Sequence, residues 1–356
     1  MIAASPQSNQ QNPANQQNPD VDAVAPQLAR VPAWQRALAQ AITDPAELLS
    51  LLHLDVALLP AAQAAVKLFP LRVPRGFVAR MQPGNVADPL LRQVLPLDLE
   101  LQNIPGFIDD PVGDLASRVA PGVLHKYAGR ALLISTGACG VHCRYCFRRH
   151  FPYGEELASS GQWRDAVAAI KADASIHEVI LSGGDPLSLN DRRLRELTRQ
   201  LEQLPHVMRL RIHSRQPIVL PERVDAELLN WLGSTRLQTV MVLHANHARE
   251  IDASVVAACR ALTQVGVRLF NQSVLLKGVN DNATALAELS ETLFAAGIQP
   301  YYLHLLDRVQ GAAHFEVPEI QAQVLMRDLL TRLPGYLVPR LVREISGHAS
   351  KTPVPF

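Results

Sequence analysis

Residues 137–149 read GACGVHCRYCFRR and contain three cysteines, Cys139, Cys143 and Cys146, in the spacing C-x3-C-x2-C. Three cysteine thiolates can hold three irons of a cubane [4Fe-4S] cluster, whose full protein complement is four cysteines. One iron would then stay open to bind a small molecule. This stretch therefore predicts an iron–sulfur centre at which the chemistry of the protein takes place.

A zinc site is the main alternative for the same cysteines. Structural zinc takes four ligands, usually as two close pairs, and no second Cys or His pair follows this run. His142 and His150 lie nearby and could complete four ligands, so the residues alone leave zinc open. The fourth cysteine, Cys259, lies in an apolar helical pattern, which indicates a buried core thiol.

Acidic and basic residues nearly cancel. The 356-residue chain has 34 Lys and Arg against 33 Asp and Glu, a formal net charge of +1. This balance provides no electrostatic footprint for nucleic acid or an anionic membrane, so we expect a small-molecule substrate. No apolar run has the length of a membrane span, and the start MIAASPQSNQ lacks a basic segment followed by an apolar one. We therefore expect a cytoplasmic protein that contacts neither nucleic acid nor membrane.

Four regions are expected along the chain. Residues 1–32, rich in Gln, Asn, Pro and Ala, are predicted to be a disordered tail because they cannot bury enough apolar surface. Residues 33–120 are predicted to form a helical N-terminal subdomain, in which Asp44 and Pro45 start the second helix. Residues 121–335 should form the main α/β domain, and residues 336–356 a C-terminal segment.

Short apolar, β-branched runs alternate with amphipathic ones from residue 131 onward. Strands are predicted at 131–135, 178–184, 209–214, 238–244, 268–276 and 300–306, with helices at 163–172, 191–204, 224–231, 254–265, 283–296 and 320–333. Six strand–helix repeats argue for a parallel sheet that curls into an incomplete (β/α)6 TIM-like barrel. Chemistry in such folds gathers at the C-terminal ends of the strands, and the cysteines directly follow the first strand.

The run SGGDPL, residues 182–187, follows the second predicted strand. Its two glycines, Gly183 and Gly184, can bring the backbone close to a ligand. By itself, Gly-Gly-Asp-Pro is also an ordinary turn.

The cysteine spacing with its flanking aromatics, Tyr145 and Phe147, resembles the radical S-adenosylmethionine (SAM) superfamily, and SGGDPL is similar to the motif with which those enzymes hold the methionine amino group. Over residues 34–355 the chain resembles lysine 2,3-aminomutases, and best their short EpmB branch, which acts on elongation factor P. The resemblance is carried by LHKYAGRALL, CRYCFRRHFPY, RIHSRQPIVLPERV, NQSVLLKGVNDN, PYYLHLLDRVQGAAHF and YLVPRLVREISGHASKTP. It implies a radical SAM barrel and an isomerase that moves the α-amino group of L-lysine to the β-carbon, giving (R)-β-lysine.

The same resemblance implies three cofactors: a [4Fe-4S] cluster, SAM on its open iron, and pyridoxal 5'-phosphate. Removing hydrogen from an unactivated C–H bond needs an oxidant that side chains cannot supply, and in the family the adenosyl radical made from SAM is that oxidant. Pyridoxal phosphate holds the amine as an imine through which the nitrogen can migrate. The implied partners are a reducing electron donor such as flavodoxin or ferredoxin and, functionally, elongation factor P with its β-lysine ligase.

Pyridoxal binding requires a lysine able to form a Schiff base. Lys351 in GHASKTP matches the pyridoxal lysine of the family, although a lysine near a chain end is usually solvated. Lys126, Tyr127 and Arg130 in HKYAGR align with phosphate contacts of the family. Arg130 suits this role best, because a guanidinium can donate paired hydrogen bonds to a phosphate.

Charged residues match the groups that hold the two ends of the substrate in the family. Arg148 aligns with the residue that binds the lysine carboxylate, with phosphate binding or structural pairing as the alternative. Asp307 matches an aspartate that receives the ε-ammonium group. Glu344 stands where longer aminomutases have a second aspartate, and this difference leaves the product stereochemistry open.

The remaining predicted contacts are to SAM. They are Gly183, Gly184 and Asp185 in the glycine motif, and Ser214, His244 and Gln272 near strand ends. His244 and His247 could instead form a metal pair. Longer aminomutases continue past the pyridoxal lysine with zinc-binding cysteines, whereas five residues follow Lys351, so no structural zinc is expected.

Other functions remain as alternatives. The enzyme could make β-lysine for catabolism or osmoprotection. An aminomutase for glutamate should lack the negative charge of Asp307, and a non-catalytic metal-binding adaptor should not need Arg148, Asp307 and Lys351 together.

Overall fold

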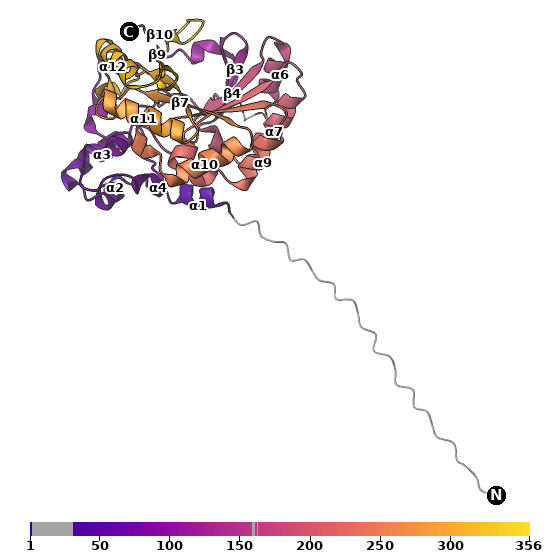
Figure 1. The fold of residues 1–356 in the computed structure, drawn as a ribbon, viewed down its shortest axis with the longest axis horizontal. Helices are drawn as coiled ribbons and strands as arrows, with labels where there is room; N and C mark the ends of the chain where they lie inside the picture. The colour runs from indigo at the N-terminus through magenta and orange to yellow at the C-terminus, as the bar shows by residue number, and fades with distance from the viewer. Residues whose placement is uncertain (2–30, 159–160, 162) are drawn as a thin grey trace. The chain divides into compact units, whose positions relative to one another are not determined.

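The computed structural model describes residue 1 and residues 31–158, 161 and 163–356. Contacts divide the chain into Met1–Pro32 and one compact unit, Ala33–Phe356. Residues 2–30 of the predicted tail lie outside the described residues, so that prediction is not tested. Figure 1 shows the ribbon of the compact unit.

A ten-stranded sheet forms the centre of this unit, and its strands are hydrogen-bonded in the order of the sequence. The strands are β1 Arg118–Ala120, β2 Val123–Tyr127, β3 Arg130–Thr136, β4 Glu178–Gly183, β5 Arg209–Ser214, β6 Gln238–Leu243, β7 Arg268–Val274, β8 Gln299–His304, β9 Arg340–Arg343 and β10 Thr352–Pro353. Strands β3 to β9 are parallel, whereas β1, β2 and β10 pair antiparallel at the two ends. Because β1 and β10 do not pair in the described chain, the barrel is open, which confirms the predicted α/β fold.

All six predicted strands are present as β3 to β8, but the sequence prediction missed a seventh parallel strand. Strand β9 pairs with β8 through Tyr302 and Arg340, Leu303 and Leu341, and His304 and Val342. Its sequence RLVR is too short and too polar at its ends to be recognised by hydrophobic pattern alone. The C-terminal segment is therefore part of the sheet.

Helices between the strands cover the outside of the sheet (Figure 1). They are α6 Arg164–Ala172, α7 Asp191–Glu202, α8 Gln216–Val219, α9 Ala226–Ser234, α10 Ala253–Gln264, α11 Ala283–Ala295 and α12 Glu319–Arg332. Asparagine or aspartate side chains cap four of them: Asn190, Asp225, Asp252 and Asn282 accept backbone N–H groups of the first turn. Alternate residues of β5 are buried, and β4 is buried at all but its last residue, as expected for strands covered by helices.

The region before the sheet contains five short helices: α1 Ala33–Ala39, α2 Pro45–Leu51, α3 Leu59–Val66, α4 Arg75–Val78 and α5 Pro89–Arg92. Asp44 caps α2 by accepting from the N–H of Ala46, and Pro45 is its first residue, as predicted. Buried side chains of this region, including Phe77 and Leu90, share one apolar core with strands β3 to β7. The helices therefore form a wall of the same unit.

Within the described ranges, the structure contains no helix that is both long and apolar enough to cross a membrane.

Candidate active site

A cavity of about 430 Å³ lies at the C-terminal ends of the parallel strands. All of the predicted site residues except Ser214 line it: Lys126, Tyr127, Arg130, Cys139, Cys143, Cys146, Arg148, Gly183, Gly184, Asp185, His244, Gln272, Asp307, Glu344 and Lys351. The fold thus brings together residues from positions 126 to 351, as expected for the functional end of a parallel barrel.

The cysteine loop follows β3 and is held by a buried ion-pair cluster. Arg144 donates from Nε and Nη2 to Glu100 at 2.8 and 2.6 Å, and Arg149 donates to the same carboxylate at 2.7 Å. Arg144 and Glu100 are almost completely buried, so these ion pairs anchor the loop to the protein interior. Sequence reasoning missed Glu100, which lies 44 residues before its partner.

The three thiols face the cavity, where each is partly exposed. Neither histidine of the zinc alternative joins them: Nδ1 of His142 lies 2.9 Å from the carbonyl of Pro70, and Nε2 of His150 lies 3.2 Å from the carbonyl of Gln310. In the part of the chain that the structure describes, no three His, Cys, Asp or Glu side chains are grouped to hold a single metal ion. A cubane does not require such a group, because each cysteine binds a different iron. The donor set therefore fits the cluster.

The two glycines of SGGDPL contact the cysteine loop. Gly183 has a φ of +115°, and a Cβ on it would lie 2.7 Å from the carbonyl oxygen of Thr136. A Cβ on Gly184 would lie 2.4 Å from the carbonyl oxygen of Ala138. The close approach that the sequence predicted toward a ligand is therefore observed toward the backbone beside Cys139, and contact with SAM stays a prediction.

Asp185 organises the next turn. Its carboxylate accepts from Oγ of Ser214 at 2.8 Å and from the backbone N–H groups of Leu187, Arg215 and Gln216 at 2.8 to 3.1 Å. Ser214 lies behind Asp185 and does not line the cavity. Its hydroxyl is bonded to Asp185, and contact between Ser214 and SAM stays a prediction.

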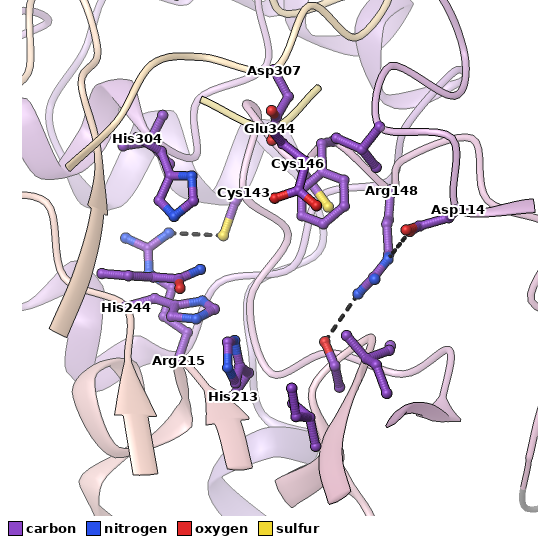
Figure 2. A pocket seen from close by; sticks show the side chains of 18 of the residues that line it. Asp114, Cys143, Cys146, Arg148, His213, Arg215, His244, His304, Asp307 and Glu344 are labelled. Carbon is purple, nitrogen blue, oxygen red and sulfur yellow. Dashed lines mark hydrogen bonds and ion pairs between the residues drawn. The ribbon is translucent and has the colours of Figure 1, made fainter. Parts of the chain in front are cut away.

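Three histidines form one wall of the cavity (Figure 2). His213, His244 and His304 come from the ends of β5, β6 and β8, and the Nε2 atom of each is buried without a partner in the described residues. Burial lowers the pKa of His244 to about 3 and the pKa values of His213 and His304 well below the usual value, so all three are neutral. Unpaired buried ring nitrogens fit a bound ligand that offers hydrogen-bonding groups.

The sequence prediction missed His213 and His304, although each lies at the C-terminal end of a predicted strand. It also offered His244 and His247 as a metal pair. Nδ1 of His247 instead accepts the backbone N–H of Arg249 at 3.2 Å and caps the short turn Ala248–Glu250.

Arg148 lies on the opposite side of the cavity, paired with Asp114 (Figure 2). Its Nε donates to Asp114 at 2.6 Å, and its Nη1 donates to Oγ of Ser182 at 2.9 Å. Lys126 also lies 2.7 Å from Asp114. Burial alone would raise the pKa of Asp114, but the charges of Arg148 and Lys126 hold this pKa below its usual range. Asp114 thus keeps a negative charge that orients two cavity cations.

Lys351 is anchored at the cavity, because β10 pairs with β9 directly after it. Its Nζ lies 2.8 Å from Oε2 of Glu344, and the hydroxyl of Tyr127 donates to Oε1 of the same carboxylate. Burial alone would raise the pKa of Glu344, but the charge of Lys351 outweighs it and keeps this pKa low. Lys351 is therefore an ordered cavity residue, in contrast to the solvated chain end considered as the alternative.

Asp307 lies in the cavity near Lys351 and Glu344 without a side-chain hydrogen bond to any described residue. Burial raises the pKa of its carboxyl to about 7. A cationic ligand bound beside this carboxyl would stabilise its ionised form.

Arg130 provides an anion-binding group. Its guanidinium lies 4.6 Å from the centre of the Tyr127 ring, and no described carboxylate lies within ion-pair distance of it. A cavity guanidinium without a carboxylate partner suits a phosphate. Together with Lys126 and Lys351, Arg130 makes a donor set that fits pyridoxal phosphate.

The family model of the Radical SAM superfamily matches residues 133–289. L-lysine 2,3-aminomutase of Escherichia coli (strain K12) is 53% identical over 322 residues, covering 90% of this chain and 94% of that protein. The chain belongs to the lysine 2,3-aminomutase family. The L-lysine 2,3-aminomutase of Haemophilus influenzae is 49% identical over 90% of this chain and 94% of its own, and that of Clostridium subterminale is 35% identical over 78% and 67%.

Membership in this family makes the protein an isomerase, and the superfamily implies a [4Fe-4S] cluster and SAM. The implied cluster agrees with the presence of Cys139, Cys143 and Cys146 in the cavity.

Proposed function

We propose that this protein is an L-lysine 2,3-aminomutase that uses a [4Fe-4S] cluster, SAM and pyridoxal phosphate. One observation carries the proposal: a single cavity contains the three cysteines, Lys351, and in Asp307 a carboxylate without a hydrogen-bond partner among the described residues. A radical SAM centre alone does not require such a lysine. L-Lysine needs an anionic partner for its ε-ammonium group, and Asp307 provides one.

Different cavity residues bind the two charged ends of the substrate. Arg148, oriented by Asp114 and Ser182, binds the lysine carboxylate through its remaining N–H groups. Asp307 and Glu344 receive the ε-ammonium group. An acidic substrate such as glutamate would meet these two carboxylates with like charge, so the arrangement favours lysine.

Lys351 is the proposed attachment site of pyridoxal phosphate, and Lys126, Tyr127 and Arg130 would hold its phosphate. When bound, the cluster and SAM supply a radical able to remove hydrogen from carbon, and pyridoxal phosphate supplies a π-system for nitrogen migration. The chain itself holds the amine of Lys351 against Glu344 and keeps neutral histidines on one wall of the cavity. Gln272 and His244 are the proposed SAM contacts with side chains free to face the cavity.

For the product, we propose (R)-β-lysine made in the cytoplasm for attachment to elongation factor P by a separate ligase. Support comes from sequence identity: the chain is 53% identical to the Escherichia coli relative over 94% of that protein, but 35% identical to the Clostridium subterminale one. A flavodoxin or ferredoxin would provide the electron. The alternative is β-lysine for catabolism or osmoprotection.

The direct test is an anaerobic assay of reconstituted full-length protein with L-lysine, SAM, pyridoxal phosphate and dithionite. Chiral chromatography should detect (R)-β-lysine. Lys351→Ala should make none, and Lys277→Ala is a matched control because Lys277 is exposed and outside the cavity. SAM cleavage without formation of β-lysine would contradict the proposal that L-lysine is the substrate. Adding the ligase and elongation factor P should then give a mass increase of one lysyl group; rejection of the product by the ligase would favour the alternative.

A further inference from the structure

Arg215 contacts one of the cluster cysteines from a buried position. Its Nη1 lies 2.8 Å from Sγ of Cys143 and donates to the hydroxyl of Tyr145 at 2.7 Å. Only 4% of Arg215 is exposed. Figure 2 shows its guanidinium pointing at the sulfur from the histidine side of the cavity. A guanidinium is thus fixed beside the sulfur of Cys143.

The other side of the guanidinium faces a buried carboxylate. Nη2 of Arg215 donates to Glu250 at 3.0 Å and to Oε1 of Gln93 at 2.6 Å. Glu250 is completely buried and also accepts from the backbone N–H groups of Asn246 and His247 at 2.9 and 3.1 Å. These bonds hold Glu250 in place. Arg215 therefore lies between the carboxylate of Glu250 and the sulfur of Cys143.

The backbone fixes Arg215 as firmly as its side chain does. Its N–H donates to Asp185 at 2.8 Å, so the residue is tied to the SGGDPL loop beside the cysteines. A guanidinium that cannot swing away or lose its proton acts on its surroundings as a constant charge. In a site shielded from water, such a charge has a large effect on any group that changes charge next to it.

We propose that Arg215 and Glu250 together set the reduction potential of the iron–sulfur cluster, with Arg215 raising it and Glu250 lowering it. The cluster takes one electron from a low-potential one-electron carrier, which is oxidised by one electron, and no bond to protein changes. Reduction adds negative charge to the cluster. A nearby cation and a hydrogen bond to a cysteine sulfur both stabilise the reduced form. Arg215 is a positioning residue in this sense, because it acts through Cys143.

The inference rests on the cluster that the superfamily implies, and not on the lysine substrate. The test is a redox titration of the anaerobically reconstituted full chain without SAM, pyridoxal phosphate or lysine, in which the reduced cluster is followed by electron paramagnetic resonance. Iron and sulfide content is measured in every sample. Wild-type protein without a cluster would contradict the proposed function, whereas a loaded cluster with unaltered potentials in the variants would contradict only this inference.

The variants Arg215→Gln and Glu250→Gln, which each remove one charge, should shift the reduction potential of the cluster in opposite directions. Arg215→Gln should lower the equilibrium constant for reduction at least tenfold, which is a shift of 59 mV for one electron, and Glu250→Gln should raise it by a similar factor. The double variant should return toward the wild-type potential. Arg215→Lys keeps the positive charge but not the planar guanidinium, so its reduction potential should shift less than that of Arg215→Gln.

A purely structural role predicts a different pattern. It would give loss of iron in both variants, or shifts of the same sign from both. If Arg215→Gln fails to load the cluster, the reduction potentials of Glu250→Gln and Arg215→Lys test the proposal instead. An unchanged potential in Glu250→Gln would overturn it. Arg223→Gln is the control, because Arg223 is also buried but pairs with Asp191, and neither residue lines the cavity. The cluster potential of this variant should match that of the wild type.

Discussion

Replacing Asp307 by Asn should stabilise the cofactor-free fold while it lowers lysine turnover. The carboxyl of Asp307 lies in the cavity, and burial raises its pKa from 3.8 to about 7. A carboxyl with a raised pKa in the folded state prefers to be neutral there. Its ionisation therefore weakens the folded state as the pH rises above the unfolded value of 3.8, and the loss is complete above about pH 7.

The magnitude follows from the shift in pKa. A change from 3.8 to about 7 is roughly three units, and each unit corresponds to about 1.4 kcal/mol, so the ionised carboxyl costs up to about 4 kcal/mol at pH 8. Water inside the cavity reduces this cost. Asn cannot ionise, so the gain in unfolding free energy of Asp307→Asn should be about 2 to 4 kcal/mol at pH 8 and near zero at pH 4.

Denaturant unfolding of the two proteins at pH 4, 6 and 8 measures this difference directly, provided that both are free of cofactors. The same substitution should lower kcat/KM for lysine at least tenfold, since it removes a charge-assisted contact with the ε-ammonium group. Wild-type kcat/KM should fall below pH 7, where Asp307 takes up a proton, and the variant should lose that dependence. A stability difference that is the same at pH 4 and pH 8 would refute the reasoning, because it would mean that Asp307 is not held neutral by burial.

Four further substitutions test other parts of the site. Cys143→Ala should abolish SAM cleavage and reduce iron and sulfide below the roughly four of each per chain expected for a cubane; cleavage that survives would place the cluster elsewhere. Lys351→Ala should keep the cluster but lose imine absorbance and the borohydride-labelled peptide containing ISGHASK, and labelling at Lys126 or Lys277 in wild type would overturn the assignment. Glu344→Gln removes the carboxylate that accepts from Nζ of Lys351 and that is proposed to receive the ε-ammonium group, so the KM for lysine should rise; an unchanged KM in steady-state assays would count against this role. Glu100→Gln leaves two buried guanidinium groups without their anion and should lower stability by about 3 to 5 kcal/mol, seen as a lower Tm, whereas an unaltered Tm would show that the buried pair contributes nothing.

The sequence by itself determined the class of chemistry and most of the barrel. The spacing of Cys139, Cys143 and Cys146 is local, so it can be read without knowing the fold. The six strands β3 to β8 were predictable because apolar, β-branched runs are separated by amphipathic helices, a pattern that depends only on which side chains must be buried. The resemblance added Lys351 and Asp307, which no local pattern would have distinguished from ordinary charged residues.

The tertiary structure alone decided which partners these residues have. Asp114 pairs with Arg148, Glu344 with Lys351, and Arg215 with Cys143, across sequence separations of 34, 7 and 72 residues. Strand β9 escaped prediction because four residues contain too little pattern, and pairing with β8 is what orders them. The neutral state of the three histidines and the raised pKa of Asp307 likewise follow from burial in a cavity that exists only after the strands have come together. Charge pairing and desolvation depend on distances in space, and these are set by packing rather than by position along the chain.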